Sequence, residues 1–275
     1  MRIRIAHTTT YRYDQPARRL QQILRLTPRS SDSQHVRSWR VIVRPEVRLR
    51  HDEDMLGNHL LRLCLEGPTQ EISISVSGEV QTSDTHGILR GVTERFPPAL
   101  FLRETALARA DASLRDFARE AAGAPGRNRL DVLHDLMRAI HQRMIFDPRH
   151  THAATTAAEA FALGRGVCQD LTHVFIAACR TLDIPARYVS GYFVRNDGVT
   201  EQEAAHAWAE AHDPLLGWVG FDPANCICPT DAHVRVAVGL DYNGAAPVRG
   251  SRSGGGAETL DVALTVAQAS RQGQA

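Results

Sequence analysis

Residues 164–170 read Gly164-Arg165-Gly166-Val167-Cys168-Gln169-Asp170, and the rest of the chain can be interpreted outward from this stretch. Its two glycines permit backbone conformations and close approaches that a side chain would prevent. Beyond the cysteine, apolar residues recur at helical spacing, at Leu171, Phe175, Ala178 and Leu182. The pattern therefore places Cys168 at or near the N-terminus of a helix.

A helix N-terminus is a reactive position for a cysteine. Unpaired N–H groups and the helix macrodipole favour a negative charge there, and the thiolate is the nucleophilic form of the side chain. Most free cysteines, however, are small buried apolar residues. Cys168 taken alone is therefore open to both interpretations, and the choice depends on whether the chain also supplies a base.

The composition is that of a globular protein. The 275 residues suffice for one large or two ordinary domains, with 43% hydrophobic and 23% charged residues. A formal net charge of +1 gives no overall field that would attract nucleic acid or an anionic membrane, so neither is expected as a partner. Several early arginines alternate with apolar residues, as on the solvated face of a sheet: Arg2, Arg4, Arg12, Arg18, Arg19 and Arg25.

Three features predict a cytoplasmic protein with reduced thiols. No apolar run is long enough to span a bilayer. The first residues, Met-Arg-Ile-Arg-Ile, lack the apolar segment and cleavage site of a signal peptide. The five cysteines are odd in number and scattered, unlike a disulfide framework.

The pattern of residues 1–85 predicts a β-rich domain, which we expect to be sandwich-like. Apolar and polar residues alternate with the period of a strand, and turn signals at 52–58 and at Gly67-Pro68 separate the runs. The domain has no cluster of chemically active side chains. A scaffold or substrate-positioning role is therefore expected.

Residues 86–110 are interpreted as a connecting region, and 111–268 as a core of helices and strands. Helices are predicted over 111–122, 130–144 and 156–163, before the helix that begins at Cys168. Strands are predicted over 187–192, 204–211, 217–221, 233–238 and 259–266. A flexible loop is predicted at 251–256, and a flexible tail at 269–275.

His206 and Asp222 supply a base and a carboxylate. The strands on either side of a turn at Pro214 place His206 and Trp208 on one face, and Gly220 and Asp222 on the matching face. A hairpin centred on Pro214 pairs His206 with Asp222 and Trp208 with Gly220. Because opposed Cβ atoms lie about 4.5–5.5 Å apart, Asp222 is predicted to hold the imidazole of His206.

Such a pair can activate a thiol. The imidazole takes the thiol proton and later returns it to the leaving group, while the carboxylate fixes the tautomer of the imidazole. Taken singly, His206 also fits an ordinary strand histidine, and Asp222 fits a turn residue before a proline. Their joint occurrence after a cysteine that begins a helix favours the catalytic interpretation.

Four blocks of the chain, in the right order, resemble the transglutaminase-like superfamily. They are Gly166-Val167-Cys168-Gln169-Asp170, Ile184-Pro185-Ala186-Arg187-Tyr188-Val189-Ser190-Gly191-Tyr192, His206-Ala207-Trp208-Ala209-Glu210 and Gly217-Trp218-Val219-Gly220-Phe221-Asp222-Pro223. The resemblance is to the bacterial branch, in which a β-rich domain precedes the catalytic core. It implies an α+β fold with a papain-like core and a catalytic triad of Cys168, His206 and Asp222.

The resemblance also implies an activity: acyl transfer on peptide or glutamine-type amides through an acyl-thioester. The enzyme would be a cysteine peptidase or amidase, or a transglutaminase, and hydrolysis is preferred because water needs no second binding site. The expected substrate is a peptide or protein. A non-catalytic peptide-binding module with the same fold is the alternative. No cofactor or metal is expected, since the chain has no EF-hand loop or comparable acidic cluster.

The groups that would stabilise an oxyanion are partly assigned. The backbone N–H of Cys168 is the natural first donor. Gln169 and Trp208 are candidates for the second donor or for substrate contact, although packing is the preferred role of Trp208. Asp170 lies in the first helical turn, where capping is preferred to a substrate contact.

The remaining cysteines have other predicted roles. Cys226 and Cys228, together with His212 and His233, suggest zinc, but one intervening residue between the cysteines fits structural zinc spacing poorly. The pair is therefore expected to line a loop beyond Asp222. Two further cysteines are expected to be structural: Cys179 in the core and Cys64 in the β-rich domain.

Overall fold

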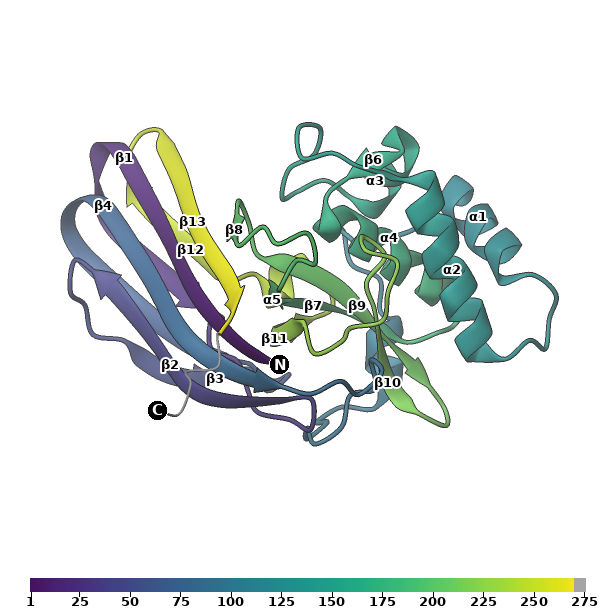
Figure 1. Ribbon diagram of the computed structural model, residues 1–275. Coiled ribbons are helices and arrows are strands. Elements are labelled where there is room, and N and C mark those ends of the chain that lie inside the picture. Colours follow the sequence, from purple (N-terminus) through teal and green to yellow (C-terminus); the bar gives the residue numbers. More distant parts are fainter. Residues whose placement is uncertain (270–275) are drawn as a thin grey trace, which may run out of the picture.

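The computed structural model describes residues 1–269 and has an α+β architecture. A large antiparallel sheet lies on one side, a four-stranded antiparallel sheet lies in the middle, and the helices cover the opposite side (Figure 1). This arrangement confirms the predicted α+β class. Within residues 1–269, no helix combines the length and the apolar character needed to cross a membrane.

The large sheet has seven strands, five of which form its main path. In spatial order these are β2 (Gln34–Arg44), β4 (His59–Thr82), β1 (Arg2–Leu24), β13 (Glu258–Gln268) and β8 (Glu201–Gln202). Two more strands lie off this path: β12 (Val248–Gly254) pairs with β1, and β3 (Arg50–Glu53) pairs with β4.

The predicted turn at Gly67-Pro68 is instead a bend inside one strand. β4 continues through both residues, and its partner β1 continues through Pro16. Their pairing is interrupted twice, between Arg12 and Ala17, where Pro16 lies, and between Ala17 and Arg19, opposite Gly67-Pro68. Proline cannot donate to the ladder. Side chains from both halves of β1 and β4 share one buried cluster, so the sheet folds over on itself. One folded sheet, rather than two separate sheets, thus encloses the core of the sandwich-like domain that the sequence predicts.

The C-terminal strands belong to this sheet rather than to the predicted 111–268 core. β13 pairs with the first half of β1, and β12 pairs with its second half. Residues 251–254 of the predicted flexible loop are part of β12, and only the glycines at its end form the turn into β13. Periodicity along the chain cannot reveal a pairing between segments so far apart. The predicted tail lies outside the described residues from 270 onward.

The four-stranded sheet carries the second half of the fold. Its order is β10 (Gly217–Phe221), β9 (His206–Asp213), β7 (Ala186–Phe193) and β11 (His233–Gly239). Helix α4 (Cys168–Thr181) packs on β9 and β7 and is buried from Asp170 to Arg180. Around α4 pack α1 (Ala112–Ala122), α2 (Arg129–Arg143) and α3 (Ala157–Leu163). The four predicted helices are confirmed to within a residue or two.

The short elements complete the path of the chain. They are η1 (Pro98–Leu102), β5 (Ile145–Phe146), β6 (Arg165–Gly166) and α5 (Tyr242–Ala245). Two predicted helix signals are seen directly: Thr156 caps the N-terminus of α3, and Gly164, at φ 65°, ends it.

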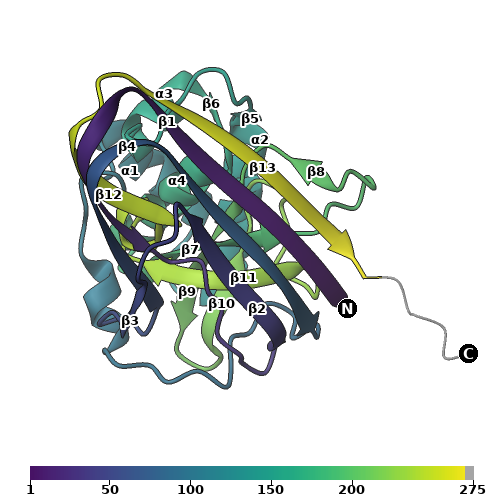
Figure 2. The ribbon, with the colours of Figure 1, turned by 90° about the vertical axis from the view of Figure 1, so that its left-hand side faces the viewer.

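Two amide side chains fix the large sheet to β11. Gln34 donates to the carbonyl of Arg235 and accepts from its N–H, each at 2.8 Å. Asn58 does the same with Val238, also at 2.8 Å in both directions. The amides thereby satisfy backbone groups of β11, the strand at one edge of the four-stranded sheet. The long strands β1, β4 and β13 cross over the four-stranded sheet (Figure 2), and one hydrophobic core includes both sheets.

Candidate active site

Cys168 is the first residue of α4, and an acidic side chain caps this helix. The N-cap residue Val167 has no polar side chain that could cap the helix. Its backbone N–H donates to Asp170 Oδ2 at 2.8 Å, so the carboxylate of the third helical residue closes this end. Thr151 donates to the same oxygen at 2.7 Å. A Cβ on Gly166 would lie 2.5 Å from this oxygen, so glycine is needed there. The predicted capping role of Asp170 is confirmed.

The helix start leaves Cys168 half-buried and the neighbouring Gln169 engaged elsewhere. The Gln169 amide donates to the carbonyl of Ala153 at 3.1 Å and so binds the loop before α3. The backbone N–H of Cys168 is at the first helical position, where no intrahelical acceptor exists. It is thus available to an oxyanion formed beside the sulfur.

The hairpin of β9 and β10 has a register that differs from the predicted one by two residues. Asp213 accepts from the backbone N–H groups of Leu215 and Leu216, at 2.9 and 3.0 Å, and Gly217 has φ 80°. The loop therefore has three residues, 214–216, and Gly217 with its positive φ closes it. Its centre is Leu215 rather than Pro214. A shift by two positions keeps every side chain on its predicted face.

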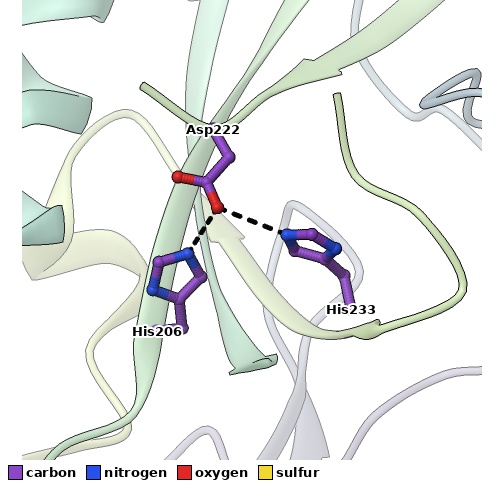
Figure 3. A group of neighbouring side chains, drawn as sticks. All are labelled: His206, Asp222 and His233. Carbon is purple, nitrogen blue, oxygen red and sulfur yellow. Dashed lines mark hydrogen bonds and ion pairs between the residues drawn. The ribbon is translucent and has the colours of Figure 1, made fainter. Parts of the chain in front are cut away.

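His206 and Asp222 meet in spite of this shift. His206 Nε2 lies 2.7 Å from Asp222 Oδ2 (Figure 3). Asp222 is fully buried, and its Oδ1 accepts the backbone N–H groups of Ala224 and Asn225 at 3.1 and 3.2 Å. Although burial opposes the charged form, His206 and His233 hold the pKa of Asp222 well below its usual range. The residue is therefore a carboxylate at neutral pH.

The imidazole of His206 lies between this carboxylate and the thiol. Burial lowers its pKa, but the charge and hydrogen bond of Asp222, followed by a hydrogen bond with Cys168, raise that pKa to about 10. Because Nε2 is bound to Asp222, Nδ1 is the nitrogen that remains for the sulfur. The contact between His206 and Asp222 agrees with the predicted triad, and the effect of Cys168 on the pKa of His206 indicates that the thiol lies near the imidazole.

A second histidine, His233 of β11, contacts the same carboxylate oxygen. Its Nδ1 accepts from the N–H of Thr230 at 3.1 Å, so its Nε2 carries the proton and lies 3.3 Å from Asp222 Oδ2 (Figure 3). Burial is the main cause that lowers the pKa of His233, which stays neutral. Asn225 Nδ2 also donates to Oδ2, at 2.7 Å. Sequence reasoning considered His233 only as a zinc ligand and missed Asn225, because only the fold brings them to Asp222.

Trp208 packs behind the triad. Its side chain is 2% exposed, and its ring meets that of His233 edge-on at 5.3 Å. A Cβ on Gly191 would lie 2.6 Å from the indole ring, so the indole occupies the space that this glycine leaves. These contacts fit the packing role preferred for Trp208.

Among residues 1–269, one cluster has three potential metal ligands close together: His206, Asp222 and His233. Their contacts are hydrogen bonds that converge, with Asn225, on a single carboxylate oxygen. The cluster is therefore a hydrogen-bond network around Asp222 Oδ2. The expectation that no metal is needed stays a prediction.

The other cysteines lie apart from this network. Cys226 and Cys228 flank Ile227, which pairs with Asp222, and burial raises the pKa of Cys228 to about 11. Cys179 is fully buried as predicted, and burial raises its pKa. The expectation for Cys64 was wrong, since this residue is exposed: it lies on the outward face of β4.

Fold and site together define a class of protein, in which a papain-like α+β core sets a helix-start cysteine against a histidine–aspartate pair on a sheet. Residues 3–81 match the bacterial transglutaminase-like N-terminal region, and residues 115–223 match the transglutaminase-like superfamily. The chain belongs to this superfamily, in its bacterial branch with the β-rich N-terminal region.

Relatives and solved structures agree with this assignment. An uncharacterized protein of Mycobacterium leprae is 31% identical over 278 residues, which cover 96% of this chain and 98% of that protein. An uncharacterized protein of Mycobacterium tuberculosis H37Rv is 28% identical, over 90% of this chain and 87% of the other. A crystal structure from Cytophaga hutchinsonii, provisionally named a cysteine protease, has the same fold. It superposes with a TM-score of 0.80 at 23% identity, over 100% of this chain and 92% of that one.

Proposed function

We propose that this protein is a thiol-dependent acyl-transfer enzyme that acts on peptide or glutamine-type amides through an acyl-thioester. The observation that carries the proposal is the series Cys168, His206 and Asp222. His206 Nε2 lies 2.7 Å from Asp222 Oδ2, and, against the effect of burial, the carboxylate and the thiol raise the pKa of the imidazole. A thiol nucleophile requires a base within hydrogen-bond reach and a third group that orients the base. Each member of the series occupies one of these roles.

The first half of the reaction forms the acyl-enzyme. The Cys168 thiolate attacks the amide carbon, and the carbonyl oxygen becomes an oxyanion that the Cys168 N–H can bind. The imidazolium of His206 gives its proton to the leaving nitrogen, the carbon–nitrogen bond breaks, and an amine or ammonia departs. Asp222 keeps the imidazole oriented and stabilises its charged form.

The second half releases the acyl group. His206, now neutral, takes a proton from a water molecule, whose oxygen attacks the thioester carbon. The carbon–sulfur bond breaks, a carboxylic acid leaves, and the thiolate–imidazolium pair is restored. Hydrolysis is preferred over transfer to an amine because water needs no second binding site.

Apolar side chains beside the nucleophile support a polypeptide substrate. Ile145, Phe146 and Leu163 are 62%, 58% and 52% exposed. Phe146 pairs in register with Gly166, two residues before Cys168. Large exposed apolar side chains typically mark binding surfaces, and β5 pairs with β6, the strand that leads into the helix beginning at Cys168.

The test is incubation of the protein with a glutaminyl peptide and a labelled amine. Hydrolysis predicts released ammonia or cleaved peptide without label, whereas a transglutaminase incorporates the amine. Cys168→Ala should abolish either reaction while the circular dichroism spectrum and melting temperature are retained. Full activity in folded Cys168→Ala protein would refute the proposal. A wild-type protein that binds the peptide but never forms product would instead indicate a non-catalytic binding module.

A further inference from the structure

An arginine-rich groove of about 770 Å³ lies on the folded end of the large sheet, outside the site described above. Its lining comes from β1 and the residue that follows it, from β3, β4 and β12, and from the loop before β3. One acidic side chain, Glu66, is among the lining residues. Six arginines line the groove: Arg19, Arg25, Arg48, Arg50, Arg62 and Arg249. The net charge of +1 for the chain conceals this local concentration.

Strand register places three of these arginines in one row. Arg50 pairs with Arg62, Arg62 pairs with Ile23, and Ile23 pairs with Arg249. Paired residues of antiparallel strands point to the same face, so the row crosses four strands on one side of the sheet. Neighbouring strands are roughly 4.8 Å apart, so the row from Arg50 to Arg249 extends over about three such spacings between strands.

Like charges directly opposite one another destabilise a sheet, and local carboxylates compensate only part of the positive charge of the groove. Asp52 lies 3.1 Å from Arg62, Asp54 lies 3.2 Å from Arg25, and Glu66 lies 3.6 Å from Arg19. Arg48, Arg50 and Arg249 form no ion pair within residues 1–269. A bound anion would offset the repulsion that remains.

We propose that this groove, the arginine groove, is a docking site for a carboxylate-rich segment of a polypeptide. Guanidinium groups match carboxylates through paired N–H donors. Two edge strands favour a polypeptide, because in the described part of the chain β3 pairs only with β4, and β12 only with β1. An extended peptide can add hydrogen bonds along such an edge.

Other polyanions fit the groove less well. Single-stranded nucleic acid is bound by aromatic side chains that stack on bases, and the lining contains no aromatic residue. An interfacial membrane site buries a large apolar surface, and this lining is mainly arginine and other polar residues. The alternation of arginines with apolar residues at the start of the chain, interpreted above as a solvated face, thus acquires a second role at Arg19 and Arg25.

The test uses a fluorescein-labelled octaglutamate peptide and fluorescence anisotropy with the full-length protein at about 50 mM salt, where exposed charges are weakly screened. The variant Arg50→Ala/Arg249→Ala should bind at least tenfold more weakly. The control Arg4→Ala/Arg40→Ala removes the same charge from exposed positions of the same sheet outside the groove, and it should bind like wild type. Turnover of the glutaminyl peptide should be unchanged in both variants, so the docking and catalytic proposals can fail separately.

Three outcomes would overturn the docking proposal. One is equal binding by the two double variants when both show wild-type melting temperatures. Another is tighter binding of a thymidine octanucleotide than of octaglutamate. The third is binding to phosphatidylglycerol vesicles that octaglutamate does not displace. Should the Arg50→Ala/Arg249→Ala variant fail to fold, the single variants Arg50→Lys and Arg249→Lys give the same comparison, since lysine keeps the charge but loses the paired donors.

Discussion

His206 and Asp222 meet along a diagonal of the β9–β10 hairpin. The observed register pairs Ala209 with Phe221, and by extension the position opposite Asp222 is that of Trp208. His206 therefore lies one step further along its strand on the same face, yet its Nε2 reaches Asp222 Oδ2 at 2.7 Å. A diagonal contact leaves room beside the carboxylate, and His233 and Asn225 occupy that room.

Asp222→Asn is expected to lower kcat for the glutaminyl peptide by about 10²–10⁴-fold, because an amide cannot stabilise the imidazolium and can select the wrong tautomer. More residual activity should remain than in Cys168→Ala. Steady-state kinetics of both variants measure this. Asp213→Asn is the matched control, since Asp213 holds the turn of the same hairpin without touching the triad. Equal activity of Asp222→Asn and wild type would show that the carboxylate has no part in catalysis.

Iodoacetamide is expected to modify Cys168 at least about tenfold faster than Cys64 at pH 7, because the imidazole of His206 can act as a base for the Cys168 thiol and the thiolate is the reactive form. Cys64 is exposed and serves as the internal reference, while buried Cys179 should stay unmodified in the folded protein. Peptide mapping by mass spectrometry measures all three rates. In the His206→Ala variant, Cys168 should react only as fast as Cys64. An unchanged rate would show that the imidazole does not activate the thiol.

His233→Phe is expected to lower kcat by about tenfold with little change in KM. An aromatic ring beside Phe193 and Trp208 is kept, while the N–H donor to the carboxylate and the acceptor for the Thr230 N–H are lost. A hydrogen bond to a charged group contributes about 1.5–3 kcal/mol, and about 1.4 kcal/mol corresponds to tenfold in rate. The pH profile of kcat/KM should also shift, since loss of the hydrogen bond from His233 to Asp222 changes the electrostatic environment in which the His206–Asp222 pair titrates. Phe193→Leu, which disturbs the same packing and removes no donor, should leave the profile in place.

Glu210→Gln is expected to destabilise the protein by about 3–5 kcal/mol at pH 7, because it leaves two arginines without their shared buried partner. Arg187 and Arg235 each lie 2.7 Å from the Glu210 carboxylate. Although burial opposes its charge, these arginines lower the pKa of Glu210 to about 2. The stabilisation is therefore present in full above about pH 4.5, the ordinary range of a glutamate, and is lost as the pH falls toward 2.

Urea unfolding of wild type and Glu210→Gln at pH 7 and pH 3 tests this dependence. The difference between the two proteins should be smaller at pH 3. Glu94→Gln is the control, because Glu94 pairs with Arg187 from a position that is 35% exposed and should cost less. A difference for Glu210→Gln that is independent of pH would contradict the assignment of a buried carboxylate.

Local patterns in the sequence were sufficient for the four helices α1 to α4 and for the faces of the strands around the site. Thr156, Gly164 and the apolar spacing beyond Cys168 each act within one or two turns of chain, and the structure has helix boundaries where these signals predict them. Side-chain alternation likewise placed His206 and Asp222 on matching faces. A register error of two residues did not separate them, because the strand period is two.

The sequence by itself determined a cysteine at a helix start and a histidine and an aspartate on facing strands, because caps, periods and turns are local interactions. Only the tertiary structure decided that β12 and β13 join the N-terminal sheet, that His233 and Asn225 share Asp222 Oδ2, and that Arg50, Arg62 and Arg249 form one row. These contacts join segments far apart in the chain or depend on strand register. Alternation of side chains specifies a face of a strand but not its partner, so such contacts follow from packing of the whole fold.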